Sequence, residues 1–171
     1  LNVIVEAGPS ACTQSYKAME TIDRFAWHMA NVPGVVQVMS LPMAAKLVNA
    51  GWNDGSIRWR VLPRDRDTLR QATQSFETDS GLLNADCSAM PVAVFTADHQ
   101  SSTIDRVIKE AKEFRAKNDA YDPGFAKKRD AAAKAAQDKG EDYTTDQVSF
   151  RLATGSLGVA AAINDTVREK E

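Results

Sequence analysis

The side chains that most often carry out chemistry in proteins are few in this chain and lie far apart. The sequence contains two histidines, His28 and His99, and the second directly follows Asp98. An Asp–His pair can orient an imidazole for base catalysis, but no HExxH, GxSxG or Cys–His pattern accompanies this pair. A turn that leads into a helix explains Asp98 and His99 better. The sequence therefore predicts no catalytic residues and no enzymatic activity.

The two cysteines, Cys12 and Cys87, lack the C-x-x-C spacing of zinc and redox sites. Asp86 beside Cys87 disfavours the thiolate, which argues against a catalytic cysteine. Two cysteines are also too few for a disulfide scaffold, so by themselves they leave the redox compartment open. The carboxylates follow neither an EF-hand pattern nor a paired-ligand spacing. We expect no metal and no cofactor.

Length and composition indicate an ordinary globular domain. The 171 residues suit a single domain, since domains commonly have about 100 to 150 residues. The formal net charge of -2 argues against nucleic acid as a partner. No run of about 18 apolar residues occurs that would span a bilayer. The chain starts at Leu1 without a signal-peptide pattern, so we expect a piece of a longer protein.

The positions of the apolar residues predict a β-α-β unit in the first part of the chain. Residues 1–7 are typical of a buried strand that ends at a Gly-Pro turn. Over residues 13–29, apolar side chains recur every three to four positions, which predicts an amphipathic helix of about five turns. A Pro-Gly turn then leads into a second strand over residues 35–41.

The same unit occurs again in the second half. Residues 88–97 are typical of a third strand, residues 101–117 of a helix, and residues 147–155 of a fourth strand. Ser102 and Asp105 fit a capping box at the start of that helix. Two such units predict an α+β fold of the ferredoxin-like type, in which two helices cover one face of a four-stranded sheet.

Three segments lie outside these two units. Residues 42–85 are interpreted as an elaboration with a helix starting near Pro42, an exposed strand or extended segment, and a second helix near its end. Residues 119–146 are rich in Ala, Lys and Asp, and we expect an exposed helix ending at Gly140 rather than a mobile finger. Residues 156–171 are expected to form a last helix that leads toward a membrane.

Three separated segments resemble, in order, a periplasmic loop of exporters of the resistance-nodulation-division (RND) superfamily. They are residues 12–65, 81–107 and 150–167, and the resemblance fails only over 119–146. It is closest to the hydrophobe/amphiphile efflux branch related to the MMPL lipid transporters. The resemblance implies one periplasmic porter domain over residues 1–171, more similar to the second periplasmic loop than to the first.

The resemblance also implies a function. In such exporters of the bacterial inner membrane, proton-motive force moves porter domains that pass amphiphilic or hydrophobic molecules and lipids. The implied partners are the membrane helices and the other periplasmic loop of the same transporter, with oligomerisation left open. Apolar and aromatic side chains would line the substrate path, for which the candidates are Met43, Trp52, Trp59 and Phe76. Packing of these four side chains in a satellite core is the alternative.

A disulfide between Cys12 and Cys87 is a further implication, because related loops carry cysteines at the same two places in an oxidising compartment. The bond requires Cα atoms within about 7 Å of each other. We expect the first and third strands to run parallel, which would separate Cys12, after one strand, from Cys87, before the other. Two separately buried thiols are therefore the alternative.

A stand-alone ferredoxin-like regulatory module, which binds a small ligand between subunits, is the rival to the exporter. The two hypotheses differ in the gene that surrounds this sequence. Flanking blocks of about 20 apolar residues would favour the exporter, and a stop codon soon after Glu171 would favour the rival.

Overall fold

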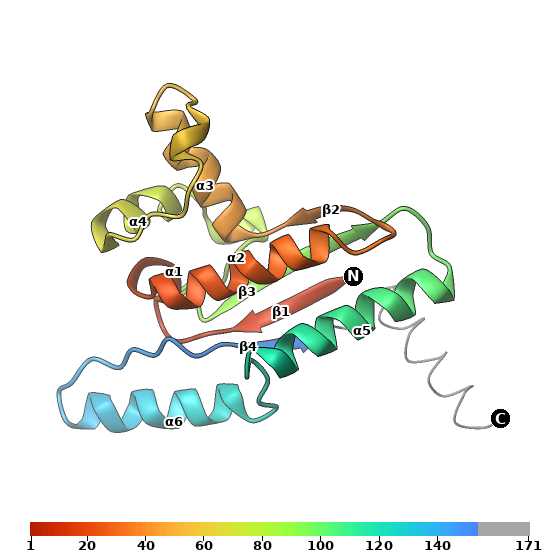
Figure 1. The fold of residues 1–171 in the computed structure, drawn as a ribbon. Coiled ribbons are helices and arrows are strands. Elements are labelled where there is room, and N and C mark those ends of the chain that lie inside the picture. Colours follow the sequence, from red (N-terminus) through yellow and green to blue (C-terminus); the bar gives the residue numbers. More distant parts are fainter. Residues whose placement is uncertain (154–171) are drawn as a thin grey trace.

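The fold is α+β and is built on one four-stranded antiparallel sheet (Figure 1). The computed structural model describes residues 1–153, so the helix expected at 156–171 lies outside the described residues. The strand order is β2-β3-β1-β4. The strands span Asn2–Glu6 (β1), Val35–Met39 (β2), Ala89–Thr96 (β3) and Ser149–Leu152 (β4). All four expected strands are present, with shorter bounds than the sequence predicted.

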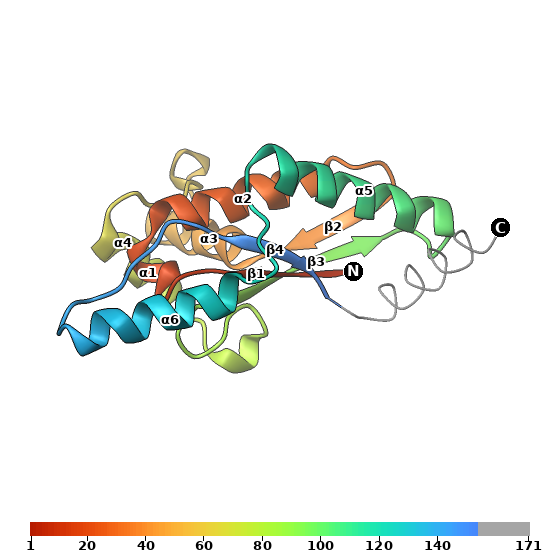
Figure 2. The same cartoon turned by 90° about the horizontal axis from the view of Figure 1, so that it is seen from below.

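The helices of the two repeated units lie together on one side of the sheet. They are α2, Tyr16–Ala30, and α5, Ser101–Lys117. Figure 2 shows α2 and α5 on one side of the strands and α6, Phe125–Asp138, on the other. No helix in the part of the chain described here is long and apolar enough to cross a membrane.

The expected parallel orientation of the first and third strands is wrong. Strands β1 and β3 are antiparallel neighbours, with Glu6 opposite Ala89. The first crossover makes β2 parallel to β1 but leaves a gap between them, and β3 fills that gap antiparallel to both. The last residue of β1 and the first residue of β3 therefore lie side by side at one end of the sheet.

Helix α2 forms where the spacing of apolar residues predicted it, with a separate short helix before it. That helix, α1, spans Ala11–Gln14. Ser15 separates the two and caps α2, because its Oγ accepts a hydrogen bond from the Ala18 amide at 3.1 Å. At the other end, Gly34 has a φ of 96° and lies where a Cβ would come within 2.7 Å of Thr103 Cγ2. Glycine therefore allows both the turn and the close approach of α5.

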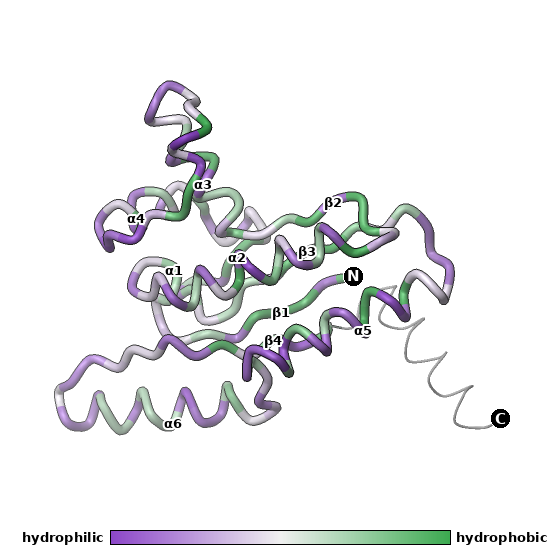
Figure 3. The backbone as a smooth tube through the Cα atoms, viewed as in Figure 1, coloured by the Kyte–Doolittle hydropathy of each residue, from purple (hydrophilic) through white to green (hydrophobic). Residues whose placement is uncertain are grey.

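The core lies between the sheet and these two helices. Three aromatic rings meet at its centre, since the ring centroid of Phe25 is 5.2 Å from that of Phe114 and 4.5 Å from that of Phe150. The strands contribute a buried aliphatic layer, which Figure 3 shows as apolar stretches of β1 and β3. This layer consists of Val3, Val5, Met90, Val92 and Val94. The alternation of buried side chains in β3 follows the period of two of a strand with one face on the core.

The elaboration between β2 and β3 contains two helices, as predicted. Helix α3 spans Leu41–Trp52 and begins at Ser40, whose Oγ accepts from the amide of Met43. Helix α4 spans Arg66–Thr73. The strand or extended segment expected after α3 is instead a 3-10 turn at Ile57–Trp59 followed by irregular chain. A strand needs a neighbouring edge for its backbone hydrogen bonds, and this part of the chain packs against a helix.

The capping box expected at Ser102 is wrong. Helix α5 starts at Ser101, and no side chain caps it. The turn before it is held by Asp98, whose carboxylate accepts from the amide of Gln100 at 3.1 Å. Asp98 and His99 thus lie in a turn that leads into the helix, as interpreted from the sequence. Because this turn already satisfies the backbone at the entry, Ser102 falls inside the helix.

The insertion between α5 and β4 contains helix α6, as expected, and α6 is anchored at one side. Phe125 at its start is buried. The Arg129 guanidinium donates hydrogen bonds of 3.1 Å to the carbonyl oxygens of Ala7 and Ser88. The rest of the helix is largely exposed, and a left-handed Gly140 follows its end. Arg129 therefore connects the insertion to the end of the sheet at which β1 ends and β3 begins.

Candidate ligand groove

A groove of about 700 Å³ lies between α2 and the α3–α4 segment. Helix α2 contributes Tyr16 and Asp23 to its lining, and α3 contributes Lys46 and Asn49. The remaining wall is the irregular chain of residues 59–65. The groove therefore lies where the elaboration meets the first helix of the repeated unit.

The wall of residues 59–61 is fixed by a single buried amide. Asn49 is only 5% exposed, and its Nδ2 donates to the carbonyl oxygens of Trp59, at 2.9 Å, and Val61, at 3.1 Å. Both hydrogen bonds are made to backbone carbonyl oxygens and leave the side chains of these residues without a polar contact to Asn49. The Trp59 and Val61 side chains are consequently left half exposed, at 52% and 50%.

Several charged side chains around the groove have defined partners. Lys46 Nζ lies 2.8 Å from Asp23 Oδ1, and both side chains are about one quarter exposed. Asp65 caps α4 by accepting from the Thr68 amide at 3.0 Å and from the Thr68 hydroxyl at 2.9 Å. These hydrogen bonds hold the pKa of Asp65 below its ordinary value. The Arg64 guanidinium lies 5.7 Å from the centre of the Tyr16 ring, a cation–π distance.

The lining of the groove combines apolar surface with charged side chains. The lining includes no histidine, cysteine or serine, and its one threonine hydroxyl, of Thr68, already donates to Asp65. Apolar surface comes from Trp59, Val61 and Leu62, and cationic and anionic side chains lie beside it. An amphiphile has the same two characters, an apolar body and a polar or charged end.

The structure places one of the four predicted path residues in the groove. Trp59 is part of its lining, whereas Met43, Trp52 and Phe76 are not. Met43 is half-buried at the start of α3, and Trp52 is 51% exposed at its end. Phe76 is half-buried after α4 and packs against the main core.

Sequence reasoning did not identify the residues that shape the groove. The sequence predicts Tyr16 only as one of the apolar side chains of the amphipathic helix over residues 13–29, and it predicts no role for Asn49. Leu62 and Pro63 are buried in a segment that is otherwise exposed. An asparagine within an apolar helix, followed by a Leu-Pro pair in an arginine-rich stretch, is the pattern that points to them.

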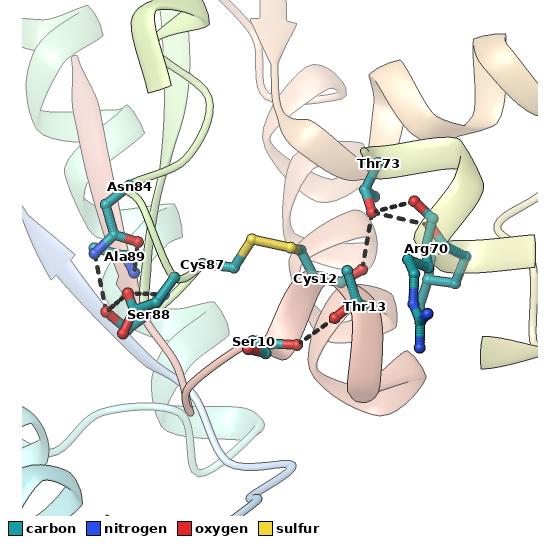
Figure 4. The surroundings of a disulfide bond; sticks show 11 residues. Ser10, Cys12, Thr13, Arg70, Thr73, Asn84, Cys87, Ser88 and Ala89 are labelled. Carbon is teal, nitrogen blue, oxygen red and sulfur yellow. Dashed lines mark hydrogen bonds between the residues drawn. A yellow bond between two sulfur atoms is a disulfide. The ribbon is translucent and has the colours of Figure 1, made fainter. Parts of the chain in front are cut away.

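The two cysteines form a disulfide near the end of the sheet at which β3 begins (Figure 4). The Cα atoms of Cys12 and Cys87 are 5.6 Å apart, and both residues are at most 5% exposed. The hydroxyl of Thr73, at the end of α4, donates to the carbonyl of Cys12 at 3.5 Å. The bond therefore links the loop before β3 to α1, which in turn contacts the elaboration.

A polar turn holds Cys87 in place. Asp86 accepts from the hydroxyl of Ser88 at 2.6 Å and from its amide at 3.2 Å, and Asn84 donates to the same hydroxyl. The Ser88 side-chain hydrogen bond is the main cause that lowers the pKa of Asp86 below its ordinary value. Cys87 itself has a φ of 56°, so this turn sets the direction of its side chain toward Cys12.

The remaining chemical candidates have structural roles. His28 Nε2 lies 3.0 Å from Glu110 Oε2 and so joins α2 to α5. His99 is exposed in the turn before α5. Within residues 1–153, no group of three or more His, Cys, Asp or Glu side chains could hold a metal ion.

Known proteins give no direct guide to the role of this groove. Comparison with models of protein families gives no match to the chain, and comparison with curated proteins gives none either. The resemblance to RND periplasmic loops therefore rests on the three sequence segments that carry it.

Proposed function

We propose that this chain is a ferredoxin-like porter subdomain from a periplasmic loop of a proton-driven RND exporter. It has no enzymatic activity in this proposal. Its part is to form one wall of a path for amphiphilic or hydrophobic molecules, and the membrane helices and the other periplasmic loop supply the rest. Proton transfer takes place in those membrane helices.

The single observation that carries the proposal is the way in which the two repeated units interlock. The strand order β2-β3-β1-β4 with α2 and α5 on one face arises when one β-α-β unit places a strand inside the other. The porter subdomains that the resemblance implies are built from such units. The sequence segments and the strand order thus support the same architecture independently.

The groove gives the proposal a location for substrate. Its apolar lining near Trp59 and its charged side chains match an amphiphile, and it opens on the side of α2 that faces the elaboration. A wall of this kind binds weakly by itself, because a path between subdomains loses half its contacts when one subdomain is alone. We expect no submicromolar affinity for detergents, bile-salt-like compounds or lipid monomers in calorimetry.

The gene around this sequence provides the most direct test. The exporter requires blocks of about 20 apolar residues on both sides. If the reading frame instead ends close to Glu171, the stand-alone ligand-binding module replaces the exporter as the explanation.

A transport assay tests the role of the groove. In the full-length gene expressed in an efflux-deficient host, Trp59→Ala should lower resistance to amphiphilic compounds. Trp27→Ala is the matched control, because Trp27 is 70% exposed on α2 and is not part of the groove lining. Equal resistance in the two variants, at equal protein levels, would contradict a path along this groove.

A further inference from the structure

The end of α3 and the turn after it project away from the sheet (Figure 1). We refer to residues 52–61 as the tip. Its four large apolar side chains are all at least half exposed, with Ile57 at 81%. They are Trp52, Ile57, Trp59 and Val61. Four such residues within one short projection form an apolar patch of the kind that marks an interaction site.

Basic side chains alternate with the apolar ones in the tip. Arg58 lies between Ile57 and Trp59, and Arg60 between Trp59 and Val61. Both arginines are exposed, and neither forms an ion pair among the residues that the structure describes. The tip contains these two arginines and one acidic residue, Asp54, a formal net charge of +1, although the whole chain has a formal net charge of -2. The tip is thus locally cationic on an acidic protein.

The tip is held in shape by its backbone rather than by its own side chains. The Asn49 amide clamps the carbonyls of Trp59 and Val61, and the Gly55 amide donates to Ala50 at 2.9 Å. Gly55 has a φ of 71°, which completes the tight turn. The backbone that carries the apolar side chains is therefore held in one arrangement, and little backbone entropy is lost when they bind.

We propose that the tip binds the surface of a membrane that contains anionic phospholipids. Arg58 and Arg60 contact lipid phosphates, and the two tryptophans with Ile57 enter the interfacial region. Trp prefers this depth because its ring is apolar and its N–H is polar. Arginines near an anionic surface each strengthen binding about fivefold. A projecting tip fits a broad surface better than it fits a small ligand, which needs a concave site. The tip shares Trp59 and Val61 with the lining of the groove, but the inference rests on the exposure and charge of the tip and not on the exporter.

Vesicle cosedimentation tests the inference with the chain itself. The protein should pellet with phosphatidylcholine vesicles that contain phosphatidylglycerol and remain in the supernatant with pure phosphatidylcholine. Added salt should weaken the binding, because salt screens the charges. In a Trp27→Phe background, the fluorescence of the remaining tryptophans should shift to shorter wavelength on binding.

Variants assign the binding to the tip. Arg58→Gln with Arg60→Gln should weaken binding to the anionic vesicles about 25-fold, from about fivefold for each arginine. The matched control is Lys127→Gln with Lys134→Gln, which removes the same charge from exposed positions of α6 and should change binding by less than about twofold. Ile57→Asp should abolish binding without a change in circular dichroism, since Ile57 is 81% exposed.

Two results would overturn the inference. Equal losses in the arginine and lysine variants would show general charge attraction instead of a specific tip. If the protein does not bind anionic vesicles but forms dimers that Ile57→Asp dissociates, the tip binds a second copy of this chain and not a membrane.

Discussion

Two aromatic residues show how differently the sheet layer and the α3–α4 segment are held together. Phe25 in α2 is fully buried, and its ring contacts those of Phe114 and Phe150. Trp59 after α3 is half exposed, and a side-chain amide holds it through its carbonyl oxygen. In the first region apolar burial supplies the stability. In the second, α3 and α4 also bury leucine and alanine side chains in the same core, but a few polar contacts determine the shape of the chain that follows α3. The elaboration is therefore free to keep apolar side chains at its surface.

The largest expected effect comes from a change in the centre of the core. Phe25→Ala should lower the free energy of unfolding by about 3–5 kcal/mol, because it removes a ring that packs against both Phe114 and Phe150 and leaves a cavity. Trp27→Ala, two positions along the same helix, is the control and should change stability by no more than about 0.5 kcal/mol. Urea unfolding measures both. A similar loss for the two variants would mean that α2 does not stabilise the fold through its buried face.

The disulfide lies where the two regions meet, because the carbonyl of Cys12 accepts a hydrogen bond from Thr73 at the end of α4. Its removal should therefore sharpen the difference between them. Cys12→Ser with Cys87→Ser should lower stability by about 2–4 kcal/mol, since the bond closes a long loop in the unfolded chain. The loss should be greatest for α1 and the elaboration, measured by hydrogen exchange. Non-reducing mass spectrometry of the unmodified protein should find a peptide that joins both cysteines. Two freely alkylated thiols in protein prepared under oxidising conditions would rule the pairing out.

Asn49 provides a smaller test, confined to the elaboration. Asn49→Ala should cost about 1–3 kcal/mol, because two carbonyl oxygens lose their donor at a buried position. Residues 57–63 should then become sensitive to limited proteolysis, since trypsin cleaves after arginine and this stretch contains two. Gln71→Ala, at an exposed position of α4, is the control. Unchanged proteolysis in the Asn49 variant would show that the tip is fixed by other contacts.

The comparison also explains what the sequence could predict. Where side chains are buried on one face, their spacing reveals the element, as in α2 with its stripe from Met19 to Met29. Pairing between distant strands has no such local signal, and the orientation of β1 and β3 was therefore predicted wrongly. Residues 57–61 alternate like a strand, but alternation reveals a strand only where a free sheet edge is available. The role of Asn49 depends on chain that follows it by ten or more positions.

The smallest expected effect concerns the acidic turn beside the disulfide. The ordinary pKa of Asp86 is 3.8, and the hydrogen bonds from Ser88 lower it in the folded protein. The unfolded chain therefore takes up the proton first as the pH falls. The stabilisation by Asp86 is complete above its ordinary pKa and is lost as the pH drops toward the lowered folded value. Asp86→Asn should therefore lower the stability slightly at neutral pH, and the difference from the unmodified protein should disappear as the pH falls below about 4.

The same measurement distinguishes the contribution of this turn from the loss of stability that other carboxylates cause at low pH. Asp67→Asn, at an exposed position of α4, is the matched control and should leave the acid limb as it is in the unmodified protein. Thermal unfolding followed from neutral pH to pH 2 gives both curves. An unchanged acid limb in the Asp86 variant would mean that the Ser88 hydrogen bonds do not stabilise the carboxylate. The turn would then orient Cys87 through its backbone alone, because the left-handed φ of Cys87 does not depend on the charge of Asp86.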